Sequence, residues 1–370
     1  MKIAFVSTNE YAPWGGSEEL WSQTAIRMVK QGFNVGISIK GWKSEAKQVS
    51  EIEQSGCIVV RRWQKSIIQR GISKFYNPSD ADVFLKNFKP ELVIISQGNS
   101  IEGLTWMETC IIKNIPFVLI PQAAAENFWP SDDIAIRFAK AYILAKRCFF
   151  ISNANLKLTE KQLAVKLENA TVVANPFKVP YDIQVNWPED NKTFKLACVG
   201  RLEPVAKGQD LLLEAFKLDK WQNRPIEISL FGKGANQKSL YELKKIWNLE
   251  NVNFYGFVDK VESIWETHHA LILPSRYEGL PIAIVEAMLC ARPCIVTDVA
   301  GNAELIEDGV SGFIAVAPKV ECLDDALERA WQKRYSWYEI GQTAAINVRK
   351  LIPRDPVGVF VNELKALLKS

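Results

Sequence analysis

The chain has 370 residues, a formal net charge of +3, 48% hydrophobic residues and 24% charged residues. This length is too great for one small core and suits two α/β domains. The composition excludes a disordered chain, a collagen-like chain and a disulfide scaffold. Because the net charge is close to zero, nothing in it points to a nucleic-acid partner.

Charge and cysteine usage bear on where the protein acts. Residues 1–180 carry 22 Lys and Arg against 16 Asp and Glu, which fits either a solvated face or, less commonly, an anionic partner such as a membrane surface. The seven cysteines are odd in number and scattered, which is typical of buried thiols in a reducing compartment. Since Met1 leads directly into a strand, with no signal peptide and no apolar run of about 20 residues, we expect a cytoplasmic protein, at most peripheral at the inner face of a membrane.

Short β-rich runs alternate with helical periodicity through the first half of the chain. The expected strands are Lys2–Ser7, Asn34–Ile39, Leu92–Ser96, Phe117–Pro121, Cys148–Ser152 and Val172–Ala174. The expected helices are Ser17–Gln31 (with Ser17 as its N-cap), Ile101–Lys113, Asp132–Lys146 and Asn155–Leu167. Strands joined by helices predict a parallel, doubly wound sheet.

The pattern restarts after a polar, proline-punctuated linker over residues 180–193. The second series has strands Phe194–Val199, Ile226–Phe231, Val252–Tyr255, Ala270–Leu273 and Cys294–Thr297, and helices Gly208–Phe216, Gln237–Trp247, Pro281–Cys290 and Leu323–Lys333. We therefore predict an α/β protein with two doubly wound, Rossmann-like domains that face each other across a cleft. The expected divisions are residues 1–178, residues 179–350, and a C-terminal helix within residues 351–370 that packs back on the first domain.

The most informative stretch is Leu271–Met288, LILPSRYEGLPIAIVEAM, which is typical of a buried strand, a polar loop and a helix. Pro281 suits the first turn of that helix. The amides of Gly279 and Leu280 would then lie at the positive end of the helix, where a diphosphate is stabilised.

Two glutamates flank this loop. Glu278 precedes the helix and Glu286 lies within it, with seven residues between them. A carboxylate at each end of one ligand would accept hydrogen bonds from sugar or ribose hydroxyls. The alternative makes Glu278 a loop charge and Glu286 a solvated residue, although the apolar neighbours of Glu286 disfavour solvation.

Two cations follow the strand that opens the second domain. Gly200 ends this strand, so Arg201 and Lys207 are expected to project from the carboxyl edge of the sheet. Held there, they would stabilise the charge on a departing diphosphate. The alternative is two exposed cations on a loop, and the neighbouring Glu278 segment favours the first interpretation.

A glycine pair follows the first strand of the chain. Gly15 and Gly16 allow close approach of the backbone to an anion or a sugar, although a plain turn explains a lone pair equally well. Since no G-x-G-x-x-G motif follows this strand, a dinucleotide-dependent dehydrogenase is disfavoured.

Three segments, taken in order, resemble the retaining glycosyltransferases of family 4, which have the GT-B fold and include enzymes of bacterial polysaccharide biosynthesis. They are PWGGSE at 13–18, GRLEPVAKGQD at 200–210 and SRYEGLPIAIVEAM at 275–288. The resemblance implies catalytic roles for Arg201, Lys207 and Glu278. Family loops often space the Arg and Lys one residue closer than this chain does.

The resemblance also assigns further binding residues. Gly232 and Val258 fall in segments that resemble those lining the donor nucleotide, and Glu286 would bind its ribose. Gln122 stands where the family usually has a histidine on the acceptor or sugar side, with Glu126 nearby. Because Gln can donate a hydrogen bond but cannot act as an acid or base, no residue is assigned a proton-transfer role.

Metal binding is not expected. Asp80-Ala81-Asp82 has the carboxylate spacing of a metal-dependent sugar transferase of the other major fold, but it precedes a helical run. Charges in the first turn of a helix are the better interpretation. We therefore expect neither a metal nor any cofactor besides the sugar donor.

The resemblance implies a metal-independent, retaining hexosyltransferase that moves a sugar, with glucose as the first candidate, from a UDP-sugar donor to a saccharide or lipid-linked saccharide. The donor would bind the second domain and the acceptor the first. A sugar-nucleotide epimerase of the same architecture is one alternative, disfavoured by the scarcity of histidine. A non-enzymatic two-lobed sugar-binding protein is another, disfavoured by the missing signal peptide.

Overall fold

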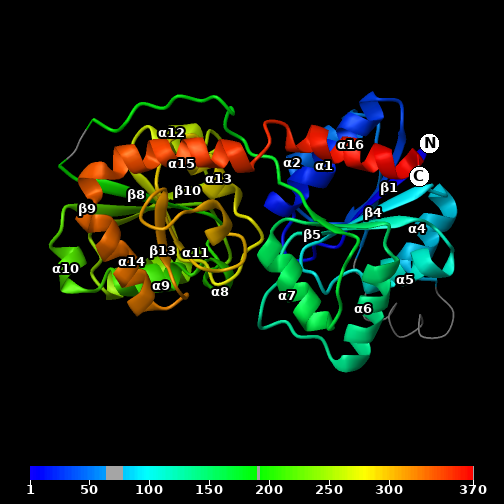
Figure 1. Ribbon diagram of the computed structural model, residues 1–370, viewed down its shortest axis with the longest axis horizontal. Helices are drawn as coiled ribbons and strands as arrows, with labels where there is room; N and C mark the ends of the chain where they lie inside the picture. Colours follow the sequence, from blue (N-terminus) through cyan, green and yellow to red (C-terminus); the bar gives the residue numbers. More distant parts are fainter. Residues whose placement is uncertain (64–77, 190–191, 370) are drawn as a thin grey trace. The chain divides into compact units, whose positions relative to one another are not determined.

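The computed structural model describes residues 1–63, 78–189 and 192–369, so residues 190 and 191 of the expected linker lie outside the described part. The chain forms two compact units. The N-terminal unit comprises Met1–Pro176 with Asp355–Ser370, and the C-terminal unit comprises Phe177–Arg354. In each unit a sheet lies between layers of helices (Figure 1).

The sheet of the N-terminal unit has seven parallel strands among the described residues, in the order β3-β2-β1-β4-β5-β6-β7. The strands are β1 (Lys2–Ser7), β2 (Asn34–Lys40), β3 (Ile58–Arg62), β4 (Leu92–Gln97), β5 (Phe117–Pro121), β6 (Arg147–Phe150) and β7 (Ala170–Val172). The helices are α1 (Gly16–Lys30), α2 (Lys47–Gln54), α4 (Asp80–Phe88), α5 (Leu104–Ile112), α6 (Asp132–Leu144), α7 (Asn153–Leu163) and α16 (Pro356–Lys369).

Helices cover both faces of this sheet. Because alternate residues of each strand point to opposite sides, the strands bury side chains on both faces. Ala4 and Val6 of β1 join a core cluster with side chains from α4, α5 and α6. On the other face, Phe149 of β6 meets Phe360 of α16 edge-to-face, with ring centroids 4.9 Å apart. Helix α16 lies beside α1 (Figure 1), so the last residues of the chain cover the sheet formed by the first.

The C-terminal unit has a sheet of six parallel strands within its described residues, in the order β10-β9-β8-β11-β12-β13. Its strands are β8 (Phe194–Val199), β9 (Ile226–Phe231), β10 (Val252–Gly256), β11 (Ala270–Leu273), β12 (Cys294–Thr297) and β13 (Gly312–Ala315). Its helices are α8 (Pro204–Lys207), α9 (Gln209–Ala215), α10 (Asp219–Gln222), α11 (Gln237–Ile246), α12 (Glu262–Trp265), α13 (Ile282–Leu289), α14 (Val320–Gln332) and α15 (Trp337–Leu351), with 3-10 turns at Ala303–Leu305 and Arg334–Ser336.

Each sheet reverses its winding once. In the N-terminal unit the chain runs from β1 outward to β3 and then returns to β4 on the other side of β1. In the C-terminal unit it runs from β8 to β10 and returns to β11 beside β8. At such a switch point the flanking connections leave in opposite directions, which opens a crevice at the carboxyl ends of the two central strands.

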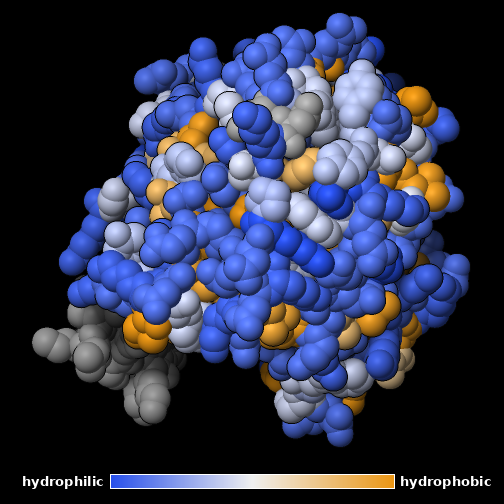
Figure 2. All heavy atoms as spheres, turned by 90° about the vertical axis from the view of Figure 1, so that its left-hand side faces the viewer, coloured by the Kyte–Doolittle hydropathy of each residue, from blue (hydrophilic) through white to orange (hydrophobic). Residues whose placement is uncertain are grey.

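The outer surface and the helix lengths fit a protein whose apolar residues are inside. The face shown in Figure 2 is mostly hydrophilic, with hydrophobic residues scattered in small groups. None of the helices in the described ranges is long and apolar enough to cross a membrane.

Some expected boundaries and elements were wrong. The N-cap of α1 is Gly15, and Ser17 lies in the first turn. Helix α13 begins at Ile282, so Pro281 is its N-cap and not its first residue. Strand β3, a half-exposed edge strand that ends in two arginines, was not expected, although a short apolar run precedes these arginines. Also unexpected were α2, β13 and α15.

The two histidines, His268 and His269, are buried. They immediately precede β11, so they enter the core with it. The Nδ1 of His269 accepts a hydrogen bond from the backbone N–H of Lys195 at 3.0 Å. His268 packs edge-on against Phe231, with ring centroids 5.2 Å apart. Burial lowers the pKa of His268 to about 4.

The buried His268 should make stability fall in acid. Because the pKa of this side chain is about 4 when folded and about 6.5 when unfolded, its contribution is complete above pH 6.5 and is lost as the pH falls to 4. The unfolded state then takes up a proton that the folded state does not, which costs about 3 kcal/mol in full. In urea unfolding between pH 7.5 and 4.5, His268→Gln should show a shallower loss than the wild type. Equal losses in the two proteins would contradict this account.

Gly208 joins α8 to α9 and has a backbone that other residues adopt with strain. Its φ is +63°, and a Cβ placed on it would lie 1.9 Å from the carbonyl oxygen of Pro274, directly after β11. The loops that follow β8 and β11 therefore touch at a point that only glycine permits.

Gly208→Ala should destabilise the C-terminal unit far more than Gly256→Ala. Both positions have positive φ, but nothing lies within 4 Å of a Cβ at Gly256. Each substitution carries a backbone cost of about 1–2 kcal/mol, and Gly208→Ala adds about 1–3 kcal/mol of overpacking. Denaturant unfolding of the two variants measures the difference, and equal free energies of unfolding would show that the loop contact is unimportant.

Candidate functional site

The predicted donor residues gather at the carboxyl edge of the C-terminal sheet. The loop after β8 carries Arg201 and leads through α8 to Lys207, and the loop after β11 carries Glu278. Strands β8 and β11 are hydrogen-bonded neighbours, with Ala197 paired to Leu271. The switch point therefore brings together two loops that are about 70 residues apart in the sequence.

Lys207 and Glu278 form an ion pair at the centre of this site. The Nζ of Lys207 donates to both carboxylate oxygens of Glu278, at 2.6 and 2.7 Å. The side chains are 20% and 7% exposed, respectively. The hydroxyl of Ser275 also donates to Oε1 of Glu278 at 2.7 Å. Glu278 is thus a charge in a loop, but its carboxylate is buried and held from two directions.

The two loops are tied together by a second ion pair that sequence reasoning missed. Arg276 forms two bonds with the carboxylate of Asp210, at 2.6 and 2.7 Å, and donates to the carbonyl oxygen of Pro204 at 2.7 Å. Thr297 of β12 donates to the carbonyl oxygen of Ser275 at 2.6 Å. Arg276 and Asp210 both lie inside the quoted motifs, but no spacing within either motif indicates that they pair.

Arg201 lies nearer the surface. Its side chain is 46% exposed, and its guanidinium meets the Glu203 carboxylate at 3.1 Å. The carbonyl oxygen of Arg201 accepts a bond from the amide side chain of Gln209 at 2.7 Å, which fixes the backbone here. In the described part of the chain, no ion pair joins Arg201 to Glu278.

Glycines let the segments at this edge approach each other. A Cβ on Gly232, whose φ is +135°, would lie 1.9 Å from the carbonyl oxygen of Gly200. The aliphatic part of Lys207 passes 3.7 Å from the Cβ position of Gly200. The packing of the protein against itself, without any ligand, therefore requires glycine at position 232. Val258 lies partly buried in the loop after β10.

Helix α13 places the remaining donor candidates. Gly279 and Leu280 are partly buried just ahead of it, and the carbonyl oxygen of Gly279 accepts a bond from Gly301 N–H at 2.9 Å. Glu286 is 4% exposed, and its Oε1 accepts a bond from the backbone N–H of Lys178 at 2.9 Å. The solvated alternative for Glu286 is therefore wrong. Glu278 and Glu286 have different partners in the structure.

In the N-terminal unit a buried carboxylate, that of Glu18, follows the glycine pair in the first turn of α1. Gly15 and Gly16 begin α1, and Glu18 in its first turn is 4% exposed. Glu18 accepts bonds from Trp21 Nε1 at 2.9 Å and from the Ser17 hydroxyl at 3.1 Å. Burial raises the pKa of Glu18, and these bonds oppose that rise. The sequence alone indicates no separate function for Glu18.

Gln122 and Glu126 differ in their surroundings. Gln122 is buried directly after β5, and its Oε1 accepts a bond from Asn175 Nδ2 at 2.9 Å. Within the described residues, its Nε2 has no hydrogen-bond partner. Glu126 is exposed. Because the Nε2 of Gln122 has a hydrogen bond left to donate, it can bond to the oxygen of a hydroxyl group. The exposed Glu126 shares no hydrogen bond with Gln122 among the residues described.

Asp80 and Asp82 lie at the start of a helix. Both lie in the first turn of α4, where Ser79 caps the helix by accepting from Asp82 N–H at 3.1 Å. Lys113 pairs with Asp82 at 2.9 Å. The prediction that these two aspartates lie in the first turn of a helix is confirmed. Across the described ranges there is no group of three or more His, Cys, Asp or Glu residues suited to a metal ion.

Comparison with known proteins identifies sequences and folds similar to this chain. Residues 182–345 match the family model of the group 1 glycosyl transferases. Poly(ribitol-phosphate) alpha-N-acetylglucosaminyltransferase of Staphylococcus aureus is 26% identical over 232 residues, which are 60% of this chain and 45% of that protein. The chain therefore spans less than half the length of this curated relative.

Two solved structures cover nearly the whole chain. HepE of Anabaena, in complex with UDP, has a TM-score of 0.77 at 19% identity and covers 99% of this chain and 100% of its own. TarM of S. aureus, a mutant in complex with fondaparinux, alpha-GlcNAc-glycerol and UDP, has a TM-score of 0.73 at 13% identity and covers 100% of both chains. The two units thus have the GT-B fold, and the segment of the C-terminal unit that carries the Lys207–Glu278 pair is similar to the group 1 glycosyl transferases.

Proposed function

We propose that the protein is a retaining glycosyltransferase that moves a sugar, with glucose as the first candidate, from a UDP-sugar to a saccharide or lipid-linked saccharide in polysaccharide biosynthesis. The observation that carries this proposal is the Lys207–Glu278 pair at the switch point of the C-terminal sheet. It lies inside the segment that matches the group 1 glycosyl transferases.

The choice of donor rests on the solved structures of the same fold. HepE is described in complex with UDP, with UDP and glucose, and with UDP-glucose. TarM is described with UDP and with saccharides. These ligands support a UDP-sugar donor and a saccharide acceptor for this chain, and the Lys207–Glu278 pair favours the C-terminal unit for the donor, which leaves the N-terminal unit for the acceptor.

The ion pair has a definite electrostatic use. An ammonium group has three N–H donors, and two of those of Lys207 bond to Glu278. Glu278 thereby orients Lys207, and a donor remains for a phosphate oxygen. Arg201, whose half-exposed guanidinium contacts Glu203, turns this group to the diphosphate when the donor binds. Glu286 accepts bonds from the ribose.

Transfer would then proceed without a protein base or a metal. The bond between the anomeric carbon and the diphosphate oxygen breaks, while the acceptor oxygen bonds to the same face of that carbon. The acceptor proton passes to the departing phosphate oxygen. Arg201 and Lys207 stabilise the charge that develops on this phosphate, which is the largest electrostatic demand of the step. Gln122 donates to a sugar hydroxyl.

A lipid-linked acceptor would bring the protein to the inner face of a membrane. The surplus of basic residues in positions 1–180 supports such a peripheral, electrostatic association. The chemistry of transfer is the same for a free saccharide.

UDP should stabilise the protein more than GDP, ADP or TDP. A ligand present at 100 times its Kd adds about 2.7 kcal/mol to the free energy of unfolding, which thermal unfolding detects. Lys207→Met should reduce the UDP shift because the phosphate loses its cation, whereas Lys238→Met, on the exposed side of α11, should leave it unchanged. Stabilisation by GDP or ADP alone would make the UDP assignment wrong. Labelled UDP-glucose then separates transfer or slow hydrolysis from epimerisation and from no turnover.

Arg201→Ala should lower turnover more than it weakens donor binding. Its interaction with the diphosphate strengthens as the glycosidic bond breaks, and one preorganised donor contributes on the order of 10²–10³ in rate. Lys207→Met should behave similarly, and the double variant should lose less than the product of the single losses because both cations serve one leaving group. Single-turnover rates and donor affinities test this, with Lys238→Ala as the control. Near-normal turnover of Arg201→Ala would exclude its catalytic role.

A further inference from the structure

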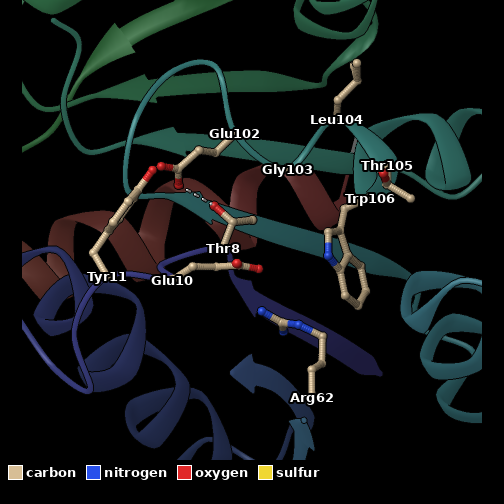
Figure 3. Close-up of a pocket in the computed structure, with 9 residues that line it drawn as sticks. All are labelled: Thr8, Glu10, Tyr11, Arg62, Glu102, Gly103, Leu104, Thr105 and Trp106. Carbon is tan, nitrogen blue, oxygen red and sulfur yellow. Dashed lines mark hydrogen bonds between the residues drawn. The ribbon is translucent and has the colours of Figure 1, made fainter. Parts of the chain in front are cut away.

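The N-terminal unit has a cavity of about 320 Å³ at its own switch point. Thr8, Glu10 and Tyr11 follow β1, Glu102 lies in the connection from β4 to α5, and Trp106 lies in the first turn of α5 (Figure 3). Arg62, the last residue of β3, closes the other side. The lining thus comes from the carboxyl ends of strands, which is where open α/β sheets bind ligands.

Arg62 supplies donors to this cavity without a carboxylate partner of its own. Its guanidinium donates to the Ser38 hydroxyl at 2.9 Å and to the Ser7 carbonyl oxygen at 2.6 Å, and it lies 5.4 Å from the centre of the Trp106 ring. Among the described residues, no ion pair involves Arg62. Since a guanidinium has five N–H groups, Arg62 keeps donors for a ligand after these two bonds.

Glu102 supplies an unused acceptor. Its Oε2 accepts from the Thr8 hydroxyl and from Gly98 N–H, both at 3.1 Å. Its Oε1 is buried and has no hydrogen-bond partner in the part of the chain that the structure describes. In Figure 3 the side chain of Tyr11 extends toward Glu102. A buried acceptor without a donor is costly, and a hydroxyl from a ligand would satisfy it.

The charges select the class of ligand. Glu10 and Glu102 outnumber Arg62, so the lining repels phosphates and carboxylates. A ligand rich in uncharged hydroxyls can donate to Glu102, accept from Arg62 and rest against the apolar faces of Trp106 and Tyr11. The volume of about 320 Å³ is at the lower end of the ~300–1,000 Å³ typical of small-molecule sites, which suits one sugar ring better than a nucleotide.

We propose that this cavity binds an uncharged sugar unit of the acceptor, with Glu102 and Arg62 as its specificity-determining residues. The proposal rests on the proposed function, because it gives the acceptor saccharide of that function a site and a charge.

The test measures binding of three probes to the full chain without a donor: methyl α-D-glucoside, methyl α-D-glucuronide and glucose 6-phosphate. Ligand-observed NMR titration should give the neutral glycoside an affinity at least tenfold higher than either anion. Glu102→Gln should weaken the neutral glycoside at least tenfold and reduce the discrimination against the anions. Thr8→Val, which removes the donor to Oε2, should weaken it less. Glu51→Gln, the same substitution at an exposed position of α2, should change neither.

Three outcomes would overturn the proposal: no binding of the neutral glycoside, equal or tighter binding of an anion, or unchanged binding by Glu102→Gln. The UDP thermal shift, measured on the same variants, reports separately on the proposed function. If UDP stabilises every variant but the glycoside result fails, only the cavity assignment is wrong. If glycoside binding depends on Glu102 but no nucleotide binds, the cavity assignment stands and the proposed function is wrong.

Discussion

The reversal of winding in each sheet is the constraint on which the rest of the structure depends. Between β8 and β11, and again between β1 and β4, the flanking connections run in opposite directions. The carboxyl ends of these central strands are therefore left open. Loops from distant parts of the sequence must meet there, and their polar side chains satisfy one another or a ligand. The Lys207–Glu278 pair is the result in one unit, and the cavity beside Glu102 is the result in the other.

The two switch points differ in charge because different residues end their strands. In the C-terminal unit, Lys207 from the loop after β8 pairs with Glu278, whose carboxylate also accepts a bond from Ser275, so a positive charge is held in place. In the N-terminal unit, carboxylates outnumber the one guanidinium, and an acceptor oxygen is left without a donor. Because transfer needs an anionic leaving group and a hydroxyl nucleophile, this difference in charge suits the two substrates of the proposed reaction.

Much of this arrangement was predictable from the sequence, and the exceptions have physical reasons. Continuous apolar runs identified the central strands, and glycine beside charged residues identified the loops after β8 and β11. Pairing between loops, as in Arg276–Asp210, has no signal in the spacing of either partner. Strand β3 is an edge strand whose apolar residues Ile58 and Val60 remain exposed, and nothing in the sequence placed Arg62 at its end beside Glu102. The aromatic ring beside His268 likewise has no signal in the spacing of the sequence.

Helix α16 has a consequence for how the chain folds during synthesis. It follows the C-terminal unit in the sequence, yet its Phe360 contacts Phe149 on the sheet of the N-terminal unit, whose strands precede that unit. On the ribosome, the face of the N-terminal sheet that α16 covers waits for the entire C-terminal unit, which is contiguous in sequence and can close as soon as its own residues emerge. The unit that begins first is thus completed second, and a chain that stops short of α16 leaves an apolar face of that sheet open to solvent.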